Sequence, residues 1–327
     1  MSTVDVNIIM PRISVIMTMY NAERFLREAI ESILSQTYRN FEFIIFDDGS
    51  TDNSVAIAES YNDPRIRLFR SPHIGRAATL NKAVEAAKTG LLAFMDADDI
   101  ALPHRMQMQY DTMVNDETID TVSSSYQLID ERGNPIREKH LPVSHEAIVE
   151  LMPMQCSVCF GAALIRTSIL LQAGMFDEKL TTAIDYDLWL RILDRAKFYN
   201  ISNSLVKVRI SNTSISSRFR NVQFRHTYEM GMHYLEEKYR NAQGDESKAK
   251  ISLQLGKLEY YYGTMVNARK YFVKILWNKP YMFVAWRFYI ASFLGSRIFM
   301  LLRSTGLADR IGNIFKKSSR KYDYFMP

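Results

Sequence analysis

The stretch LLAFMDADDI, residues 91–100, decides how the rest of the chain is interpreted. Its first five residues are apolar, which is typical of a short buried strand in a parallel sheet. Asp96, Asp98 and Asp99 follow directly, and an extended backbone would direct Asp96 and Asp98 to the same side. Carboxylates this close repel one another, and binding of Mg²⁺ or Mn²⁺ relieves the repulsion. The stretch therefore predicts a strand that delivers metal ligands to a pocket.

A second interpretation of the same residues stays open. Asp98 or Asp99 could instead cap a helix that starts near Pro103. Acidic turns are also common surface features, so the spacing of two aspartates does not by itself identify a metal site.

Strands and helices are predicted to alternate before this stretch. Apolar runs predict strands at 12–19, 41–46 and 66–69, and the segments between and after them predict helices at 22–36, 52–61 and 75–88. Asn21 is expected to cap the first helix. Such alternation with short links predicts an α/β fold with a mostly parallel sheet and helices on both faces.

Polar residues follow the predicted strands at one edge of this sheet. Thr18 and Tyr20 end the first strand, Asp48 follows the second, and the carboxylates at 96–99 follow the fourth. Ligands of parallel sheets bind at the carboxyl ends of the strands. The chain has neither GxGxxG nor GxxxxGK[ST], so a metal rather than a glycine loop is expected to meet the phosphates of a ligand.

The remaining elements divide the chain in two. We predict helices at 103–114, 145–151 and 168–173, strands at 121–129, 156–165 and 198–210, and a helix preceded by Asp185 and Asp187. The Ser- and Asn-rich link at 211–217 separates a domain of residues 1–217 from a helical domain of residues 218–327. Within the second domain, residues 249–282 fit one tetratricopeptide-like unit.

The two predicted domains carry opposite charge. Residues 1–217 have 21 Lys and Arg against 28 Asp and Glu, whereas residues 218–327 have 20 against 8. On charge alone, nucleic acid and anionic lipid are both suitable partners of the basic domain. The aromatic run 281–302 has the length of a membrane span, but Arg287 and Arg297 disfavour insertion. We therefore expect association with an anionic membrane surface and no nucleic-acid partner, although a helix core with solvated charges is an equal alternative.

The cysteines and the start of the chain bear on its compartment. Two cysteines cannot form a disulfide framework, and no apolar leader opens the chain. We therefore expect a cytoplasmic protein. If it binds lipid, we expect it on the inner face of the membrane as a peripheral protein. Cys156 and Cys159 form a CxxC downstream of His140 and His145. A zinc site is conceivable, but two buried thiols fit the apolar surroundings better.

Three ordered segments resemble the family 2 glycosyltransferases of the GT-A fold. They are ISVIMTMYNAERFLREAIESILSQTYRNFEFIIFDDGSTDNS from residue 13, AATLNKAVEAAKTGLLAFMDADDIALPHRM from residue 77, and IDYDLWLRIL from residue 184. The resemblance covers about residues 12–215. It implies a Rossmann-like catalytic domain that transfers a sugar without processivity and with inversion at the anomeric carbon.

The resemblance also implies roles for particular residues. Asp185 corresponds to the catalytic base, and Asp98 with Asp96 to the metal ligands. The implied nucleotide contacts are Thr18, Tyr20, Asn21, Asp48, Asn81 and Asp96. These roles suit the chemistry, because a carboxylate accepts a base N–H, a tyrosine ring stacks on a nucleobase, and a positioned carboxylate deprotonates an acceptor hydroxyl. The implied donor is a UDP-linked sugar held with Mn²⁺ or Mg²⁺, and the implied acceptor is a glycan or lipid-linked molecule in cell-surface polysaccharide synthesis.

Several positions depart from the family pattern. Ile184 stands where a Glu usually precedes the base, Phe160 and Gly161 replace a frequent His-Pro, and Phe94 replaces a frequent Arg. The first two lie on the acceptor side, so the acceptor is undecided. No QxxRW follows, which disfavours a processive polymerase.

Other functions and residue roles stay open at this stage. A haloacid-dehalogenase-like phosphatase needs Thr or Val where Ile100 stands, and a nucleotidyltransferase needs a glycine-rich N-terminal loop. The remaining alternative is a nucleotide-sugar-binding or scaffold protein without transfer activity. Asp185 could also be a helix N-cap, and His73 and His104 are expected to play surface or supporting roles.

Overall fold

The computed structural model describes residues 12–211 and 220–294. The chain forms two compact units, the first made of residues 1–150 and 156–223 and the second of residues 151–155 and 224–327. The domain boundary predicted between residues 217 and 218 lies outside the described residues.

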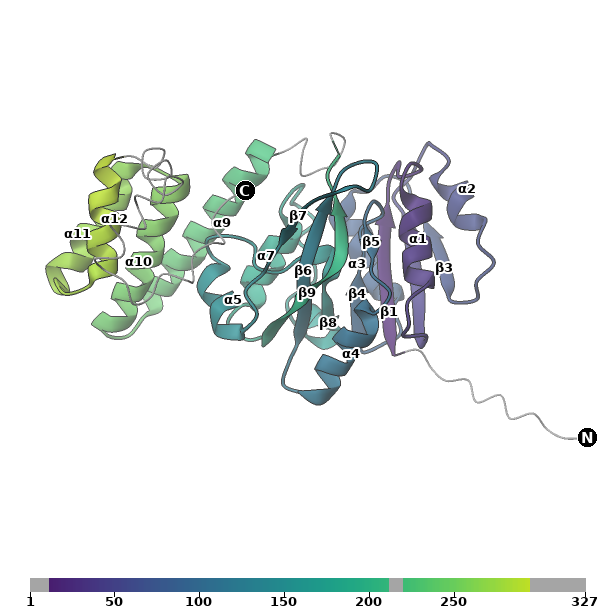
Figure 1. The fold of residues 1–327 in the computed structure, drawn as a ribbon, viewed down its shortest axis with the longest axis horizontal. Helices are drawn as coiled ribbons and strands as arrows, with labels where there is room; N and C mark the ends of the chain where they lie inside the picture. Colours follow the sequence, from purple (N-terminus) through teal and green to yellow (C-terminus); the bar gives the residue numbers. More distant parts are fainter. Residues whose placement is uncertain (1–11, 212–219, 295–327) are drawn as a thin grey trace, which may run out of the picture. The chain divides into compact units, whose positions relative to one another are not determined.

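A sheet of nine strands carries the described part of the first unit (Figure 1). Eight strands follow the order β3-β2-β1-β4-β8-β6-β9-β5, and β7 pairs with β6 off this path. The strands are β1 (Ile13–Met19), β2 (Phe41–Asp47), β3 (Ile66–Arg70), β4 (Leu91–Phe94), β5 (Ile100–Ala101), β6 (Thr121–Ile129), β7 (Pro135–Lys139), β8 (Leu164–Arg166) and β9 (Phe198–Arg209).

Parallel pairing brings the ends of three strands to one edge of this sheet. β1 pairs in parallel with β2 up to Met19 opposite Asp47, and with β4 up to Ile16 opposite Phe94. β8 runs antiparallel to β4 and β6, β9 runs parallel to β6, and β5 runs antiparallel to β9. The predicted α/β fold is therefore confirmed, with a sheet that is mixed rather than parallel beyond β4.

Amphipathic helices pack on the sheet because their apolar residues recur on one stripe. In α1, the side chains of Leu26, Ala29, Ile30 and Ile33 are buried in one core cluster with residues of β1 and β2. The helices of this unit are α1 (Leu26–Leu34), α2 (Ser54–Glu59), α3 (Arg76–Ala86), α4 (Arg105–Asn115), α5 (His145–Leu151), α6 (Thr167–Gln172) and α7 (Ile184–Ile192).

One predicted helix cap is wrong, and one alternative is excluded. α1 begins at Leu26 rather than after Asn21, which has a left-handed φ of 50° and accepts a hydrogen bond from the Thr51 N–H at 2.8 Å. A carboxylate cap of the helix near Pro103 is excluded because β5 follows Asp99 and α4 begins only at Arg105. The loops after β1 and β4 are therefore used for other contacts.

The strand predicted at 156–165 is also wrong. A short 3₁₀ helix, η1 (Phe160–Ala162), precedes β8, and only Leu164–Arg166 is extended in the sheet. An apolar run does not distinguish a buried loop from a buried strand, because the residues of both are shielded from water. The hairpin partner β7 was not predicted, and it follows the turn at Gly133, whose φ is +84°.

The described part of the second unit is helical. Its helices are α9 (Arg220–Asn241), α10 (Asp245–Tyr262), α11 (Met265–Asn278) and α12 (Phe283–Leu294). Gly256 of α10 lies against Phe272 of α11, where an added Cβ would be 2.5 Å from the ring, and Thr264 caps α11 by accepting the Asn267 N–H. α10 and α11 thus form a closely packed pair in the region of the predicted tetratricopeptide-like unit.

In the part of the chain that the structure describes, no helix is both long enough and apolar enough to cross a membrane. The predicted aromatic run continues beyond α12 into residues 295–302, which lie outside the described residues.

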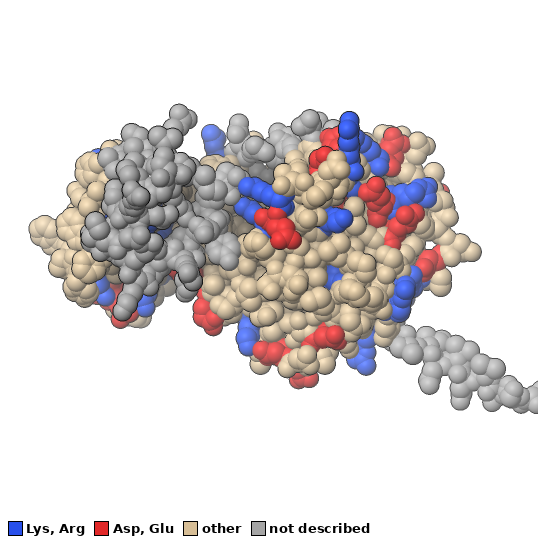
Figure 2. Space-filling model, in the orientation of Figure 1, with Lys and Arg blue, Asp and Glu red and all other residues tan. Residues whose placement is uncertain are grey.

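Figure 2 shows acidic and basic side chains mixed over the visible face of the first unit. The acidic excess of the first unit therefore forms no continuous patch on this face. The acids of functional interest are therefore those that the fold brings close together.

A buried carboxylate joins the start of β2 to its neighbours. Glu42 accepts hydrogen bonds from the Ser14 hydroxyl (2.6 Å), the Lys88 N–H (2.9 Å) and the Arg67 guanidinium (2.6 Å). Burial opposes its ionisation, but these hydrogen bonds outweigh that effect and lower the pKa of Glu42.

We expect Glu42→Gln to lower the free energy of unfolding by about 1.5–3 kcal/mol at pH 7, because it weakens hydrogen bonds to a charged group. The folded pKa lies below the unfolded value of about 4.3, so this stability is present above that pH and is lost as pH falls through the folded pKa. Urea denaturation followed by circular dichroism measures the difference. Glu59→Gln, which removes a half-exposed partner of Arg70, is the control. An equal loss in both variants would contradict the assignment.

Candidate active site

The loop after β2 fixes the start of α3 through Asp48. The Asp48 N–H donates to the Met19 carbonyl at 2.9 Å, and its buried carboxylate accepts the N–H groups of Ile74 (2.7 Å) and Gly75 (3.1 Å). Gly75 has a φ of +93°, which disfavours a side chain there. Asp48 therefore organises the entry to α3, and its predicted contact to a nucleobase stays a prediction.

Aromatic rings mark the end of β1. Tyr20 is 47% exposed and stacks on His73, with ring centroids 4.2 Å apart. His73 Nδ1 lies 2.9 Å from Asp48 Oδ2, so the histidine contacts both Tyr20 and Asp48. The predicted contact of Tyr20 with a nucleobase stays a prediction.

The three aspartates after β4 form an electrostatically strained group. Burial and the charge of Asp96 raise the pKa of Asp98 to about 6. Burial, with the charges of Asp98 and Asp96, raises the pKa of Asp99 well above its usual range. Each shift means that the group favours additional positive charge nearby.

Arg76 supplies positive charge to this group. It is the first residue of α3, and its guanidinium lies 2.6 Å from Asp96 Oδ1 and over the Phe160 ring. Burial alone would lower the pKa of Arg76, but the charges of Asp96, Asp185, Asp98 and Asp99 raise it. Arg76 is therefore a basic residue that lies among the acids, which the sequence analysis did not predict.

Asp185 joins the same group from α7. It lies in the first turn of the helix, whose N-cap is Ala183, so the alternative in which Asp185 is the N-cap is excluded. Burial raises the pKa of Asp185, the charge of Asp96 adds to this effect, and Arg76 opposes it. The tertiary structure thus places Asp185 within electrostatic range of the acids that follow β4.

The backbone before Asp185 is strained. Ala183 has a φ of 55°, in the left-handed region that a non-glycine residue occupies at a cost of roughly 1–2 kcal/mol. This conformation lies at the N-cap of α7, two residues before Asp185.

Two buried arginines hold the acidic loop from behind. The Arg209 N–H donates to Asp99 Oδ1 at 2.8 Å, and its guanidinium donates to the Asp98 carbonyl and to Glu28. Arg105 is 0% exposed and donates to the Phe94 carbonyl at 2.7 Å. Gln109, one turn after Arg105, bonds the carbonyls of Val122 and Ala162. Together these side chains fix the ends of β4 and β8.

The donor chemistry of Asp96 and Asp98 fits Mg²⁺ or Mn²⁺. Both offer carboxylate oxygens, and Mg²⁺ is commonly bound by one or two carboxylates with the other positions filled by water and substrate phosphate. Within residues 12–211 and 220–294, no group of three His, Cys, Asp or Glu side chains is arranged to hold a metal ion. Two carboxylates would leave the other coordination positions of a metal to water and substrate phosphate.

The other predicted residues have mixed placements. Thr18 is partly buried near the end of β1, while the amide of Asn81 bonds Phe176 and Glu178, so any contact with nucleotide would be additional to this structural role. His104 is the exposed residue before α4. Cys156 and Cys159 are free thiols whose pKa values are raised by burial, and the Cys156 Sγ–H donates to the Val158 carbonyl.

Sequence reasoning missed Arg76, Arg209, Arg105 and the closeness of Gly161 to the acids. A Cβ on Gly161 would be 3.0 Å from Asp96 Oδ2 and 3.2 Å from Asp99 Oδ2. The available signals were an arginine directly after the helix-initiating Gly75 and an arginine within the apolar run before the Ser- and Asn-rich link. Neither signal indicates by itself which carboxylate the arginine meets.

Comparison with known sequences adds a family to this geometry. The family model described as Glycosyl transferase family 2 matches residues 14–172. The uncharacterized glycosyltransferase MJ1057 of Methanocaldococcus jannaschii is 35% identical over 237 residues, covering 70% of this chain and 81% of the relative. The O-antigen biosynthesis glycosyltransferase WbnJ of Escherichia coli is 32% identical over 217 residues, covering 63% and 82%.

Some relatives are much longer than the match. An uncharacterized glycosyltransferase of Rickettsia felis is 33% identical over 223 residues, which cover 66% of this chain but 37% of the relative. This chain therefore spans little more than a third of that relative's length.

Solved structures share the fold at low sequence identity. Residues 1–349 of S. aureus TarS in complex with UDP-GlcNAc give a TM-score of 0.55 at 16% identity, covering 86% of this chain and 89% of that one. The mannosyltransferase PcManGT of Pyrobaculum calidifontis, in complex with GDP-Man and Mn²⁺, gives 0.52 at 16% identity, covering 94% and 88%. The GT-A type of the fold is thereby confirmed.

We expect Gly161→Ala to weaken Mn²⁺-dependent binding of nucleotide diphosphate by roughly 10- to 100-fold, the usual cost of disturbing groups around a metal site. The new methyl group would press on the carboxylates of Asp96 and Asp99. Isothermal titration of UDP and GDP with Mn²⁺ measures the loss.

Gly90→Ala is the matched control, because a Cβ at Gly90 meets nothing within 4 Å. Unchanged nucleotide binding by a folded Gly161→Ala protein would show that this close approach does not matter for the site.

Proposed function

Because this chain belongs to glycosyl transferase family 2, we propose that it is an inverting transferase that moves a sugar from a UDP-linked donor to an acceptor hydroxyl. The acceptor in this proposal is a glycan or a lipid-linked molecule in the synthesis of a cell-surface polysaccharide. One observation supports the proposal above others: Asp185, the acids after β4 and Arg76 lie within electrostatic range at the carboxyl ends of the parallel strands.

The geometry supports distinct roles for these side chains. Asp98 and Asp96 would hold Mg²⁺ or Mn²⁺, which when bound offsets the charge that develops on the leaving diphosphate. Arg76 adds a fixed positive charge beside Asp96, where it can donate to phosphate oxygens. Tyr20 stacks on the base, and Asp48 holds the loop that faces it.

Asp185 acts as the general base in this proposal. Its carboxylate takes the proton of the acceptor hydroxyl as the oxygen attacks the anomeric carbon, and the bond from that carbon to the diphosphate oxygen breaks. Attack opposite the leaving group inverts the anomeric configuration. Its raised pKa makes Asp185 a stronger base than an ordinary aspartate.

The donor and acceptor are proposed from different observations. UDP is favoured by the UDP-GlcNAc complex of TarS, while the GDP-Man complex of PcManGT shows that this fold also accommodates a guanine nucleotide. The O-antigen role in the name of WbnJ supports a polysaccharide pathway. Ile184, in place of the usual Glu, keeps a binding or scaffold protein as the alternative, and the absence of both sugar transfer and donor hydrolysis would favour it.

The proposed place of action is the cytoplasmic face of a membrane. Lys and Arg outnumber Asp and Glu by 20 to 8 in residues 218–327. Such a charge excess attracts a protein to anionic lipid, where a lipid-linked acceptor would be found.

We expect Asp98→Asn to weaken Mn²⁺-dependent UDP binding, because it removes one charged oxygen ligand. The protein should stay folded, because the substitution also lowers the repulsion with Asp96 and Asp99. Thermal shift with UDP, in Mn²⁺ and in chelator, measures this effect. Asp111→Asn, an exposed carboxylate of α4, is the control. Tight UDP binding in chelator that the substitution leaves unchanged would contradict the metal assignment.

We expect Asp185→Asn to lower the transfer rate by roughly 10²–10⁴ while donor binding stays near that of the parent. The parent should lose activity as pH falls through the pKa of Asp185, and burial places that loss above the ordinary aspartate value of about 3.9. The variant should lack this acid limb.

Rate measurements against pH, beside Asp187→Asn as a carboxylate control in the same helical turn, test the assignment. Asp187 pairs with Arg191 at 2.8 Å. Near-normal turnover of Asp185→Asn would place the base elsewhere, and weakened donor binding would make Asp185 part of the donor site.

A further inference from the structure

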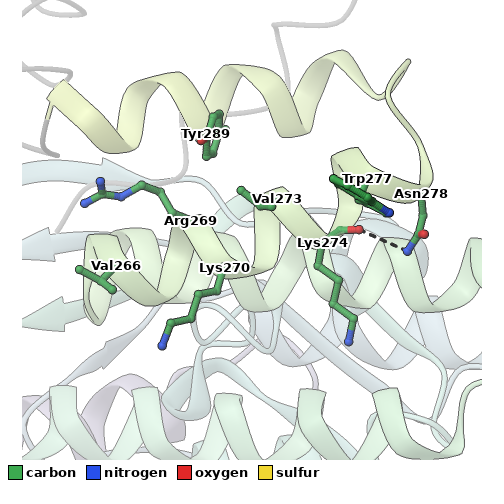
Figure 3. A pocket seen from close by; sticks show the side chains of 8 residues that line it. All are labelled: Val266, Arg269, Lys270, Val273, Lys274, Trp277, Asn278 and Tyr289. Atoms are coloured by element: carbon green, nitrogen blue, oxygen red, sulfur yellow. Dashed lines mark hydrogen bonds between the residues drawn. The ribbon is translucent and has the colours of Figure 1, made fainter.

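The second unit presents a groove of about 580 Å³ between α11 and α12. Asn278 at the end of α11 and Tyr289 of α12 line it, together with six further residues of α11 that we call the α11 face: Val266, Arg269, Lys270, Val273, Lys274 and Trp277. Figure 3 shows Lys270 and Lys274 directed to the same side of α11, with Val273 and Tyr289 between the two helices. The spacing of these residues places them along one side of the helix.

The α11 face is unusually apolar for a surface exposed to water. Within the described residues, Trp277 is 86% exposed, Val266 59% and Val273 43%, and Phe293 of the neighbouring α12 is 59% exposed. The Arg269 guanidinium lies 4.6 Å from the centre of the Phe293 ring, which joins the two helices at this surface. Contiguous exposed apolar groups of this kind mark an interaction site.

The charge around the groove has one sign. No Asp or Glu occurs in the sequence between Glu259 and Asp309, while seven Lys and Arg do. Neither Lys270 nor Lys274 has a carboxylate within ion-pair distance in the described part of the chain; Lys270 approaches Asn267, and Lys274 lies over the Tyr239 ring. The occupant of the groove must therefore tolerate apolar contact and supply negative charge.

Three other occupants fit this combination less well. Residues 295–327 carry seven Lys and Arg against two Asp, so their charge has the same sign as that of the face. A second copy in a two-fold contact would bring the basic residues of each α11 face together. Nucleic acid would meet Lys270 and Lys274 but would leave Val266 and Val273 without an apolar partner, because phosphate contacts dominate its binding.

We infer that the α11 face lies on a bilayer surface rich in anionic lipid. Trp277 and Tyr289 suit the headgroup region, where aromatic side chains gather. Val266, Val273 and Phe293 would enter the upper acyl layer, and Lys270 and Lys274 would meet lipid phosphates. The inference rests on the proposed function at a membrane, and it names the side chains that contact the lipid.

Sedimentation of the full chain with vesicles tests this inference. Vesicles of phosphatidylcholine with and without 30% phosphatidylglycerol, a mole fraction chosen to give roughly the negative surface potential of a cytoplasmic leaflet, are compared at low and high salt. We expect binding that needs phosphatidylglycerol and weakens with salt. Lys270→Glu with Lys274→Glu should lower the partition coefficient by at least about tenfold, and Trp277→Ser should lower it with less effect on the salt dependence.

A matched control keeps the charge change away from the groove. Arg240→Glu with Lys250→Glu alters two exposed residues of α9 and α10 by the same charge and should retain most binding. An equal loss of vesicle binding in both double variants would mean that net charge alone determines binding, and this would overturn the inference. Loss in neither would overturn it as well.

Further measurements separate the other occupants. Acrylamide should quench Trp277 in the vesicle-free protein, as judged against Trp277→Phe, and protection of Trp277 there would show that the chain itself covers the face. A dimer in solution that Lys270→Glu disrupts, or tighter binding to a duplex oligonucleotide than to vesicles, would also overturn the inference. Sugar transfer to a water-soluble acceptor without vesicles should be the same in all variants, so failure of the membrane contact and failure of the proposed function are distinguishable.

Discussion

Repulsion among carboxylates is the constraint on which the site depends. Asp96, Asp98 and Asp99 follow one another after β4, and the fold adds Asp185 to them. Like charges that are buried together destabilise the folded protein unless positive charge lies close to them. Arg76 supplies part of it in the structure, while burial and the charge of Asp96 still raise the pKa of Asp98.

The surrounding structure holds these acids where they repel one another. Arg209 bonds the acidic loop through its N–H and its guanidinium, and its ring contact with Phe25, at 4.4 Å, ties that loop to α1. Arg105 and Gln109 saturate carbonyl groups beneath the same loop. These bonds restrict the backbone, so the acids cannot relieve their repulsion by moving apart. A rigid site with this negative charge favours a cationic ligand, or a substrate that binds together with a cation.

The two units of the chain divide the physical tasks. The first unit concentrates negative charge at the carboxyl edge of its parallel strands, where a diphosphate with its metal would be bound. The second unit concentrates positive charge and aromatic side chains on α11 and α12, where there are no acidic residues. The proposed donor site and the proposed membrane contact therefore carry charges of opposite sign.

The sequence by itself determined the features that depend on neighbouring residues. Apolar runs located β1, β2 and β4, and the residues after those runs indicated where Asp48, Asp96 and Asp98 lie, because parallel strands end at a common edge. The family resemblance singled out Asp185. Only the tertiary structure decided which charges meet: Arg76 and Asp96 are 20 positions apart, and Arg209 and Glu28 are 181 apart. The helix cap at Asn21 was mispredicted because the Asn21 side chain instead accepts the N–H of Thr51, 30 positions away.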